Sequence, residues 1–255
     1  MRVVSLTCSN TEIVCALGAE GLLVGVDDHS DFPEAVVSRL PRVGKDLDVD
    51  AARVAALKPD LVLASLTVPG HEKVLDRLAR EKLNILVLAP RSIDEVMRDM
   101  LQIGGILGRG EAAVQAVAAM RQGLAPVTRA TRSRLLVEWW PKPVIGAARR
   151  SWVQDLLDRA GIDNVLGDRD VESCPLDDAA VAALEPDAVV ISWCGVPLQK
   201  YRTEVVARRA SLAQSRAVRE GHIFPISEAF LGRPGPRLVE GYAALCAIAD
   251  RLEAR

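Results

Sequence analysis

Aromatic residues are scarce in this chain of 255 residues, at 4% of the sequence, and histidine occurs only three times. The core must therefore consist mainly of Val, Leu, Ala and Ile, a composition that suits buried parallel strands flanked by helices. The charges nearly cancel, with a formal net charge of −2 at pH 7. This balance gives no indication of a nucleic-acid partner or of binding to an anionic membrane surface.

Long apolar runs and paired cysteine motifs are also absent. No run approaches the roughly 20 apolar residues that a membrane helix needs, so we expect no membrane insertion. The N-terminal stretch MRVVSLTCSNTEIVCALG has one basic residue and the pattern of a strand, a turn and a helix, unlike a signal peptide. Five cysteines without a CxxC pair favour free thiols in a reducing compartment. We expect a cytoplasmic protein if the chain is complete, and a periplasmic or extracytoplasmic one if a leader has been removed.

Recognisable catalytic motifs are missing as well. The sequence has no GxGxxG after its first strand, no GxxxxGK[ST], no GxSxG and no HExxH. His71 is followed by a glutamate, but no second histidine follows at the helical spacing that a zinc site requires. We expect no catalytic residue, no catalytic cofactor and no dedicated metal site. A binding protein is therefore favoured over an enzyme.

The sequence does contain an internal repeat. Residues 54–65 are VAALKPDLVLAS and residues 181–192 are VAALEPDAVVIS, separated by about half of the chain. Each copy has the pattern of a helix, a turn and a strand, because proline cannot continue the helix and restricts the residue before it. The repeat predicts two similar α/β lobes. The alternative is a local helix-turn-strand unit that the chain uses twice.

A helical segment separates the two copies. From Ser92 to about Gln122, apolar residues recur at three- and four-residue steps with no competing strand pattern. Paired glycines at 104–105 and the glycines at 108 and 110 predict a bend or a break between two helices. We therefore divide the chain into an N-terminal α/β lobe, a connecting helical segment and a C-terminal α/β lobe, at residues 1–91, 92–123 and 124–255.

The loops that follow the predicted strands are the expected ligand-binding positions, because open parallel sheets bind ligands beyond the carboxyl ends of their strands. Three of the four tryptophans (Trp139, Trp140 and Trp193) lie in these loops, and Trp152 begins the helix after one of them. In a chain with so few aromatics, this placement predicts a site for a flat or bulky organic ligand. Packing between the lobes is the alternative. The loops are residues 27–33, 65–72, 138–143, 192–197 and 227–237.

Two of these loops contain residue types that can ligate metals. His29 lies among Asp27, Asp28 and Asp31 and could be a metal or axial ligand, or simply part of a solvated polar loop. Cys194 could ligate a soft metal, or could be a small packing residue.

Several segments together resemble a known family. SNTEIVCALG, DHSDFP, the repeated ALKPDLVLAS and the terminal RPGPRLVEGYAAL are similar to the periplasmic-binding-protein family that binds cobalamin and iron-siderophores. EWWPKP with SWVQDLLDRAGIDN, and SWCGVP, look like its cobalamin-binding branch. The resemblance covers almost the whole chain. It implies an α/β fold of two Rossmann-like lobes bridged by a long rigid helix, with the ligand in a cleft between the lobes.

The resemblance also implies that cobalamin is the bound ligand and that the five loops line its cleft. Phe230 falls where the family has a cleft aromatic, and Thr67 and Val68 fall where it has another aromatic that this chain lacks. A ferric-siderophore or haem carrier is the alternative, for which Arg149, Arg150 and Arg233 would supply cationic contacts. The predicted ligand-binding residues are Trp139, Trp140, Trp152, Trp193, Cys194, Phe230, Arg233, Thr67, Val68, His29 and Phe32.

Binding proteins of this family dock on an ABC transporter permease through one surface glutamate on each lobe. Glu72 matches the glutamate of the N-terminal lobe, whereas the second falls at or near Gly232, where no glutamate stands. The predicted role is thus non-enzymatic corrinoid binding for uptake, salvage or intracellular handover. A cytoplasmic corrinoid-processing accessory enzyme that uses His29, Asp31 or Cys194 is a further alternative.

Overall fold

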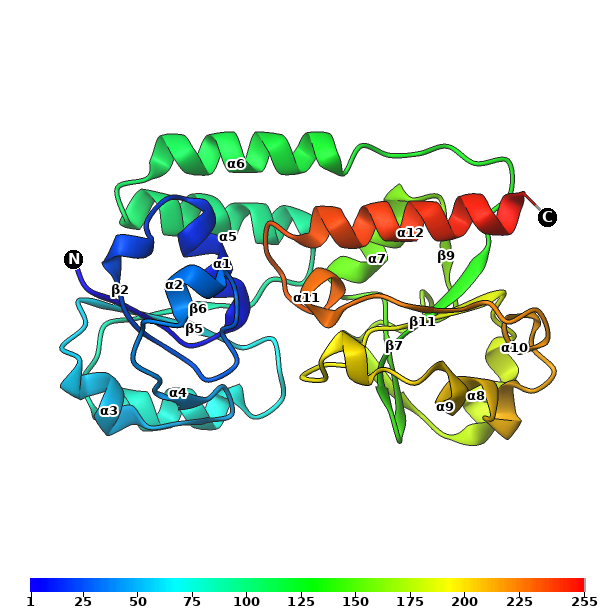
Figure 1. Cartoon of the computed structure of the whole chain (residues 1–255), viewed down its shortest axis with the longest axis horizontal. Helices are drawn as coiled ribbons and strands as arrows, with labels where there is room; N and C mark the ends of the chain where they lie inside the picture. Colours follow the sequence, from blue (N-terminus) through cyan, green and yellow to red (C-terminus); the bar gives the residue numbers. More distant parts are fainter. Residues whose placement is uncertain (255) are drawn as a thin grey trace. The chain divides into compact units, whose positions relative to one another are not determined.

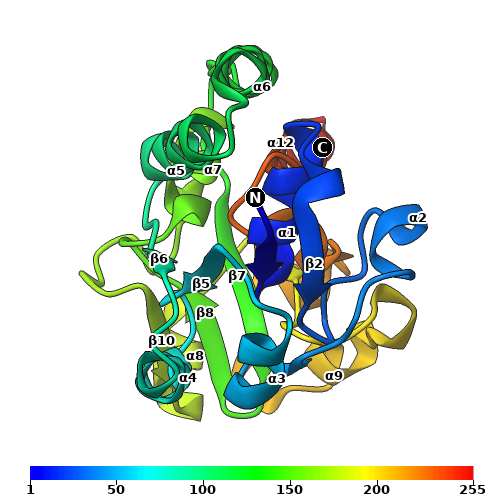
Figure 2. The same cartoon turned by 90° about the vertical axis from the view of Figure 1, so that its left-hand side faces the viewer.

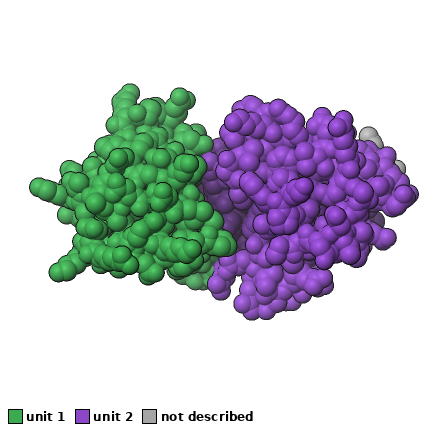
Figure 3. Space-filling model, turned by 90° about the horizontal axis from the view of Figure 1, so that it is seen from below, with its two compact units in different colours: residues 1–90, 94–120 green, residues 91–93, 121–255 purple. Residues whose placement is uncertain are grey.

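The computed structural model describes residues 1–254, and the chain forms two compact units. Unit 1 comprises residues 1–90 and 94–120, and unit 2 comprises residues 91–93 and the chain from Arg121 onward (Figure 3). Each unit contains its own β-sheet and its own hydrophobic core. The predicted α/β class with two lobes is confirmed.

Unit 1 is built on a four-stranded parallel sheet. Its strand order is β2-β1-β5-β6, with β2 at Leu23–Val26, β1 at Val3–Ser5, β5 at Leu61–Ser65 and β6 at Ile85–Leu88. Helices α3 (Ala51–Ala56) and α4 (His71–Arg80) lie on one side of this sheet, and α1 (Cys8–Ala16) and α5 (Ile93–Ile106) lie on the other (Figure 1, Figure 2). Every residue of β5 is buried, as expected for a central strand covered on both faces.

The helical segment between the repeats consists of two helices. Helix α5 ends at Ile106, and α6 covers Gly110–Gly123. Gly108 lies between them with a φ of 67°, and the Arg109 amide donates to the Gly104 carbonyl at 2.7 Å. A left-handed glycine with such a bond is a common way to end a helix. The predicted break is therefore at Gly108, and Gly104 and Gly105 lie inside α5.

Unit 2 is built on a mixed sheet. Strands β9 and β11 pair parallel with β7, and β12 pairs parallel with β11. Strand β8 pairs antiparallel with β7, and β10 pairs antiparallel with β8. The order is β10-β8-β7-β11-β12, with β9 also pairing with β7. The strands are β7 at Arg134–Pro141, β8 at Val144–Ala147, β9 at Asp163–Asn164, β10 at Ser173–Leu176, β11 at Ala188–Ile191 and β12 at Ile223–Pro225.

Helices cover both faces of this second sheet. Helices α8, α9 and α10 lie on one side, and α7 and α12 lie on the other (Figure 1). Val181, Val206 and Ala217, one from each of α8, α9 and α10, share a buried cluster with residues of the strands. The helices are α7 at Trp152–Arg159, α8 at Asp178–Leu184, α9 at Thr203–Ala207, α10 at Arg216–Arg219, α11 at Glu228–Leu231 and α12 at Leu238–Glu253.

The smaller elements connect these layers. Unit 1 has a short hairpin of β3 and β4, and unit 2 has two 3-10 turns between β11 and α10. These elements are η1 at Glu20–Leu22, α2 at Glu34–Val37, β3 at Gly44–Lys45, β4 at Asp48–Val49, η2 at Leu198–Lys200 and η3 at Ala210–Leu212. No helix within residues 1–254 is both long and apolar enough to cross a membrane.

The repeated sequence folds in the same way in both units. Asp50 caps α3 by accepting from the Arg53 amide at 3.0 Å, and Asp177 caps α8 by accepting from the Ala180 amide at 2.8 Å. After each helix one residue adopts the left-handed conformation before the proline, with φ of 49° at Lys58 and 44° at Glu185. Non-glycine residues adopt this conformation seldom.

The segment EWWPKP is a strand end and a turn, not the loop that the sequence predicted. Trp139 and Trp140 lie within β7, which continues to Pro141 and then turns at 142–143 into β8. The pairs Glu138↔Gly146 and Pro141↔Val144 hold the extension in place. The loop predicted for residues 138–143 was wrong for residues 138–141, because the neighbouring strand β8 pairs antiparallel with them.

Candidate functional site

Two tryptophans form an aromatic pair in unit 2. The rings of Trp139 in β7 and Trp152 at the start of α7 have centroids 5.9 Å apart, with planes inclined by 35°. Trp152 is buried, and its indole Nε1 donates to the Leu231 carbonyl of α11 at 2.7 Å. Trp139 is half-buried, and its Nε1 is buried without a hydrogen-bond partner. The pair thus joins β7, α7 and α11, and the indole nitrogen of Trp139 stays without a partner.

Helix α11 brings two more of the predicted residues to the same region. Phe230 lies within this helix, and the Arg237 guanidinium lies over its ring at 4.8 Å. Arg233 follows the helix, is nearly buried, and donates to Glu228 Oε1 at 2.7 and 3.0 Å. Trp152, Phe230 and Arg233 are therefore gathered around one short helix, as Trp152 bonds to its last residue.

Two of the arginines that supported the haem or siderophore alternative form ion pairs. Arg233 pairs with Glu228, and Arg150 pairs with Asp170 at 2.5 Å. The hydrogen bonds and charge of Arg150 hold the pKa of Asp170 below its ordinary value. Arg149 is exposed. The charges of Arg150 and Arg233 are thus compensated by neighbouring acids.

Trp193 lies in the core of unit 2. Its side chain is 5% exposed, and its ring lies against Tyr201 with centroids 5.3 Å apart. The indole donates to Glu138 Oε1 at 3.0 Å, and the Tyr201 hydroxyl donates to the Trp193 carbonyl, also at 3.0 Å. These contacts correspond to the packing alternative for this tryptophan. Its neighbour Cys194 is exposed.

Glu138 is a buried charged residue that was not identified from the sequence. Its side chain is fully buried, and Arg209 donates to both of its oxygens, at 2.5 and 3.1 Å. The same arginine also donates to the Pro141 carbonyl at 3.4 Å, so the ion pair joins β7 to the segment between α9 and η3. The available signal was a single acid directly after the apolar run LLV at residues 135–137.

In unit 1, the loop after β2 contains His29 and Phe32. Asp27 begins this loop, and it accepts from Ser30 Oγ and from the His29 amide. Burial of Asp27 raises the pKa of its carboxyl group. His29 and Phe32 are exposed, with Phe32 at 44%. The loop is thus held from within, and it presents an imidazole and a phenyl ring to solvent.

The loop after β5 contains Thr67 and Val68. Thr67 is half-buried and shares a 2.9 Å hydrogen bond with the Ser65 hydroxyl. Val68 is 40% exposed, Leu66 is 41% exposed, and Leu47 at the tip of the β3–β4 hairpin is 45% exposed. Exposed apolar side chains in loops at the carboxyl edge of the sheet suit contact with an apolar ligand surface. Leu47 and Leu66 were not identified from the sequence, because a single leucine in a polar loop is not a distinctive signal.

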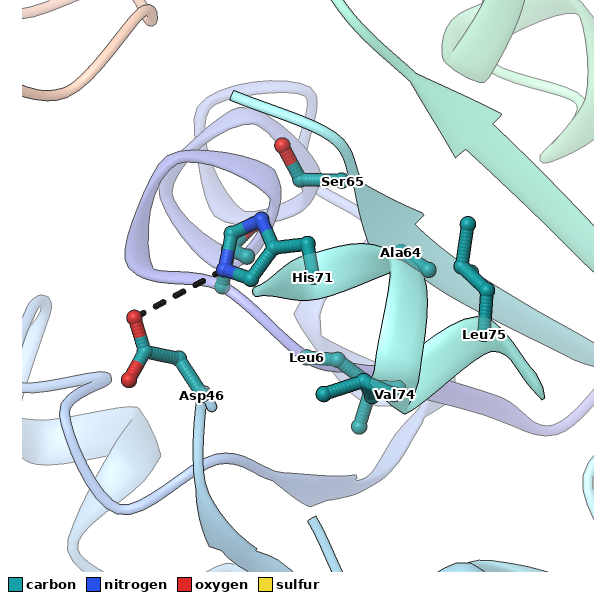
Figure 4. Close-up of a pocket in the computed structure, with 8 residues that line it drawn as sticks. Leu6, Asp46, Ala64, Ser65, His71, Val74 and Leu75 are labelled. Atoms are coloured by element: carbon teal, nitrogen blue, oxygen red, sulfur yellow. Dashed lines mark ion pairs between the residues drawn. The ribbon is translucent and has the colours of Figure 1, made fainter. Parts of the chain in front are cut away.

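A small pocket in unit 1 brings together His71, Asp46 and Ser65 (Figure 4). Asp46 lies between two histidines, with its Oδ2 3.7 Å from His71 Nε2 and its Oδ1 3.6 Å from His29 Nε2. The neighbouring His71 is the main cause that lowers the pKa of Asp46, and the charge of His29 contributes to the same shift. Asp46 is therefore an ionised acceptor at neutral pH.

The predicted docking residue Glu72 lies in the first turn of α4 and is exposed. Its own backbone amide and that of Gly70 hold the pKa of its carboxyl group below the ordinary value. Gly232 ends α11. Unit 2 has a first-turn glutamate in a similarly placed helix. Glu204 is exposed at the start of α9, the first α-helix after β11, and α4 is the first α-helix after β5.

The predicted ligand-binding residues are thus divided between the two units. Trp139, Trp152, Phe230 and Arg233 lie close together in unit 2, where Trp140 and Cys194 are exposed and Trp193 is in the core. Thr67, Val68, His29 and Phe32 belong to unit 1. A matching family model, described as periplasmic binding protein, covers residues 3–229. The chain belongs to the periplasmic binding protein family.

Three similar proteins place this periplasmic binding protein among solute-binding proteins. An uncharacterised ABC transporter substrate-binding lipoprotein of Bacillus subtilis is 26% identical over 254 residues, which cover 96% of this chain and 78% of the relative. A vitamin B12-binding protein of Yersinia pestis is 27% identical over 195 residues, or 75% of this chain and 69% of the relative. The crystal structure of a periplasmic heme binding protein from Pseudomonas aeruginosa is 29% identical with a TM-score of 0.80, and covers 96% of this chain and 91% of that chain.

Proposed function

We propose that this periplasmic binding protein binds a corrinoid such as cobalamin. The observation that supports this ligand is the Trp139–Trp152 pair beside α11, in which the Trp139 ring is half-buried and its indole nitrogen has no hydrogen-bond partner. A corrinoid presents a broad face and amide side chains, which suit apolar contact and hydrogen bonds without an ionic anchor. The ion pairs of Arg150 and Arg233 agree with such a ligand, because these cations already have partners.

Haem is the second candidate ligand. A heme binding protein is 29% identical to this chain, slightly more than the vitamin B12-binding relative at 27%. His29 supports this candidate, because its exposed imidazole could act as an axial ligand. A visible absorption change on adding haem that disappears in His29→Ala would favour haem over a corrinoid.

The proposed function is tested by titrating the apo protein with cyanocobalamin and measuring heat and visible absorption. We expect binding at micromolar ligand or tighter, and a loss of affinity of about 10- to 100-fold in Trp139→Ala, because the variant loses much of its apolar contact area. Trp140→Ala is the matched control, since the Trp140 indole is exposed and donates to the Lys142 carbonyl within the turn. No binding of cyanocobalamin by the wild-type protein would refute the proposal.

We also propose that the protein works outside the cytoplasm and delivers its ligand to an ABC transporter permease. The relatives support this role, because they include an ABC transporter lipoprotein and periplasmic binding proteins. They give no support to the cytoplasmic handover or processing alternatives. In place of the missing acid at Gly232, Glu204 is our candidate for the second docking glutamate, because its exposed position in α9 matches that of Glu72 in α4.

The docking assignment is tested with a corrinoid ABC permease in detergent. We expect Glu72→Ala and Glu204→Ala each to weaken the complex by 10-fold or more while cyanocobalamin affinity is unchanged. Glu81→Ala serves as a control, because Glu81 is also exposed but lies at the opposite end of α4. If Glu204→Ala binds the permease as the wild-type protein does, Glu204 is not a docking residue.

A further inference from the structure

The small pocket of unit 1 lies where two central strands end. Its floor comes from the ends of β1 and β5, and its sides come from the start of α4 and the tip of the β3–β4 hairpin (Figure 4). Two side chains in it are strongly polar, His71 and Asp46, and they face each other. The lining residues are Leu6, Thr7, Asp46, Ala64, Ser65, His71, Val74 and Leu75.

His71 is an unpartnered polar group at this position. Its side chain is 4% exposed, and neither ring nitrogen has a hydrogen-bond partner. Asp46 Oδ2 is 3.7 Å from Nε2 and therefore beyond hydrogen-bonding distance. A buried imidazole without partners lowers stability, so a group that bonds to it would be bound favourably.

The gap between His71 and Asp46 has a donor on one side and an acceptor on the other. The imidazole can donate through Nε2, and the Asp46 carboxylate can only accept while it is ionised. His29 lies 3.6 Å from the other oxygen of Asp46 and favours its ionised form. A group that bridges this gap must therefore accept from His71 and donate to Asp46 at the same time.

A primary carboxamide meets both requirements. Its carbonyl oxygen accepts from His71 Nε2, and its NH2 group donates to Asp46. A carboxylate could accept from His71 but would place its second oxygen against the Asp46 carboxylate, which is unfavourable in a partly buried site. The pocket thus distinguishes an amide from an acid of nearly the same shape.

We propose that the pocket between His71 and Asp46 receives a primary carboxamide of the bound ligand and makes these two residues determinants of specificity. This inference rests on the proposed function, because corrinoids bear peripheral primary carboxamides whereas haem bears carboxylates. Asp46 rejects a ligand with an acid at this position, and His71 is satisfied only when the amide is in place.

The test compares cyanocobalamin with its separated monocarboxylic acids, in each of which one peripheral carboxamide is hydrolysed to an acid. We expect the wild-type protein at pH 7 to bind one of these acids at least 10-fold more weakly than cyanocobalamin, by calorimetry. In Asp46→Asn the penalty for that isomer should fall below 3-fold, because the asparagine amide can donate to the ligand carboxylate. Asp48→Asn is the matched control, since Asp48 lies on the same hairpin with an 85% exposed side chain, and should keep the wild-type penalty.

The outcomes separate this inference from the proposed function. If the wild-type protein does not bind cyanocobalamin, the proposed function and the inference both fail. If it binds cyanocobalamin and all the monocarboxylic acids equally, the function stands and the pocket binds only water. A penalty that persists in Asp46→Asn also overturns the inference. The comparison of isomers on the wild-type protein needs no variant. If Asp46→Asn folds poorly, His71→Gln is a second variant, and we expect it to weaken cyanocobalamin binding. Unchanged affinity in His71→Gln would count against the role of His71.

Discussion

In both units, the repeated sequence connects its helix-to-strand turn to the neighbouring strand in the same way. The carboxylates of Asp60 and Asp187 each accept from the backbone amide of an arginine, at 2.7 Å from Arg2 and 2.8 Å from Arg134. The backbone amide of each aspartate donates in turn to the carbonyl of the same arginine, at 2.8 Å in both units. The side chains of these arginines then donate to the end of the preceding helix, at Leu57 and Leu184. The repeat therefore specifies how helix, turn and strand are joined, in contacts outside its own twelve residues.

The units differ where the same strands end. Strand pairing places Leu6 of unit 1 in the position that Glu138 occupies in unit 2, since Ser5 pairs with Leu63 and Val137 pairs with the repeat-equivalent Val190. In unit 2, Glu138 and Arg209 fill this region together with Trp193. In unit 1 the region is the pocket beside Leu6, where His71 has no hydrogen-bond partner. A shared scaffold thus has a closed, internally bonded edge in one unit and a pocket in the other.

The largest expected effect comes from opening the closed edge of unit 2. We expect Arg209→Ala to lower the free energy of unfolding by about 3–5 kcal/mol, because it leaves the buried Glu138 carboxylate without its cation. Arg150→Ala removes an ion pair on the surface of the same unit and should have a much smaller effect, because solvent screens exposed pairs. Urea unfolding of both variants at pH 7 measures the two changes in the free energy of unfolding. A loss for Arg209→Ala no greater than that for Arg150→Ala would show that the Glu138 pair does not stabilise the edge.

A second prediction compares the acids buried in each unit. Glu138 of unit 2 is paired, whereas Asp99 Oδ2 in α5 of unit 1 is buried without a hydrogen-bond partner. Burial, together with the charge of Glu95, raises the pKa of Asp99 to about 6. An acid whose pKa is raised in the folded state costs no stability below its ordinary value of about 4. Its cost grows as pH rises from about 4 to about 6 and stays constant above that.

We therefore expect Asp99→Asn to stabilise the protein by about 1–2 kcal/mol at pH 7, and this gain to shrink toward zero at pH 4. Urea unfolding at the two pH values measures the difference. Asp94→Asn, at an exposed position in the first turn of the same helix, should give no gain at either pH. A gain for Asp99→Asn that is independent of pH would have another cause.

The smallest effect concerns the shared turn itself. Asp60 and Asp187 make the same backbone bonds, but their side chains are 60% and 26% exposed. We expect Asp187→Ala to cost about 1–1.5 kcal/mol and Asp60→Ala about 0.5 kcal/mol, because the net value of a hydrogen bond falls with exposure to water. Thermal unfolding of the two variants side by side gives the comparison. The reverse order would mean that the repeat contributes more to unit 1 than to unit 2.

Features set by neighbouring residues could be predicted from the sequence. The two-lobe α/β class follows from the repeat, the helix break follows from Gly108, and the start of α7 at Trp152 follows from the helical pattern after it. These features depend on local periodicity, on glycine and proline, and on capping, all of which act within a few residues. The roles of the predicted ligand-binding residues stay predictions, although the structure gathers Trp139, Trp152 and Phe230 around one region of unit 2.

Only the tertiary structure decided which polar groups meet. Glu138 and Arg209 are 71 residues apart, and Trp139 meets Trp152 only because β7 and the start of α7 pack together. Asp46 reaches His71 because a two-stranded hairpin projects it toward the start of α4. No pattern in the sequence encodes such a pairing, since it depends on where each chain segment packs. The repeat determined the scaffold of both units, and long-range packing determined that one strand edge is closed while the other keeps a pocket.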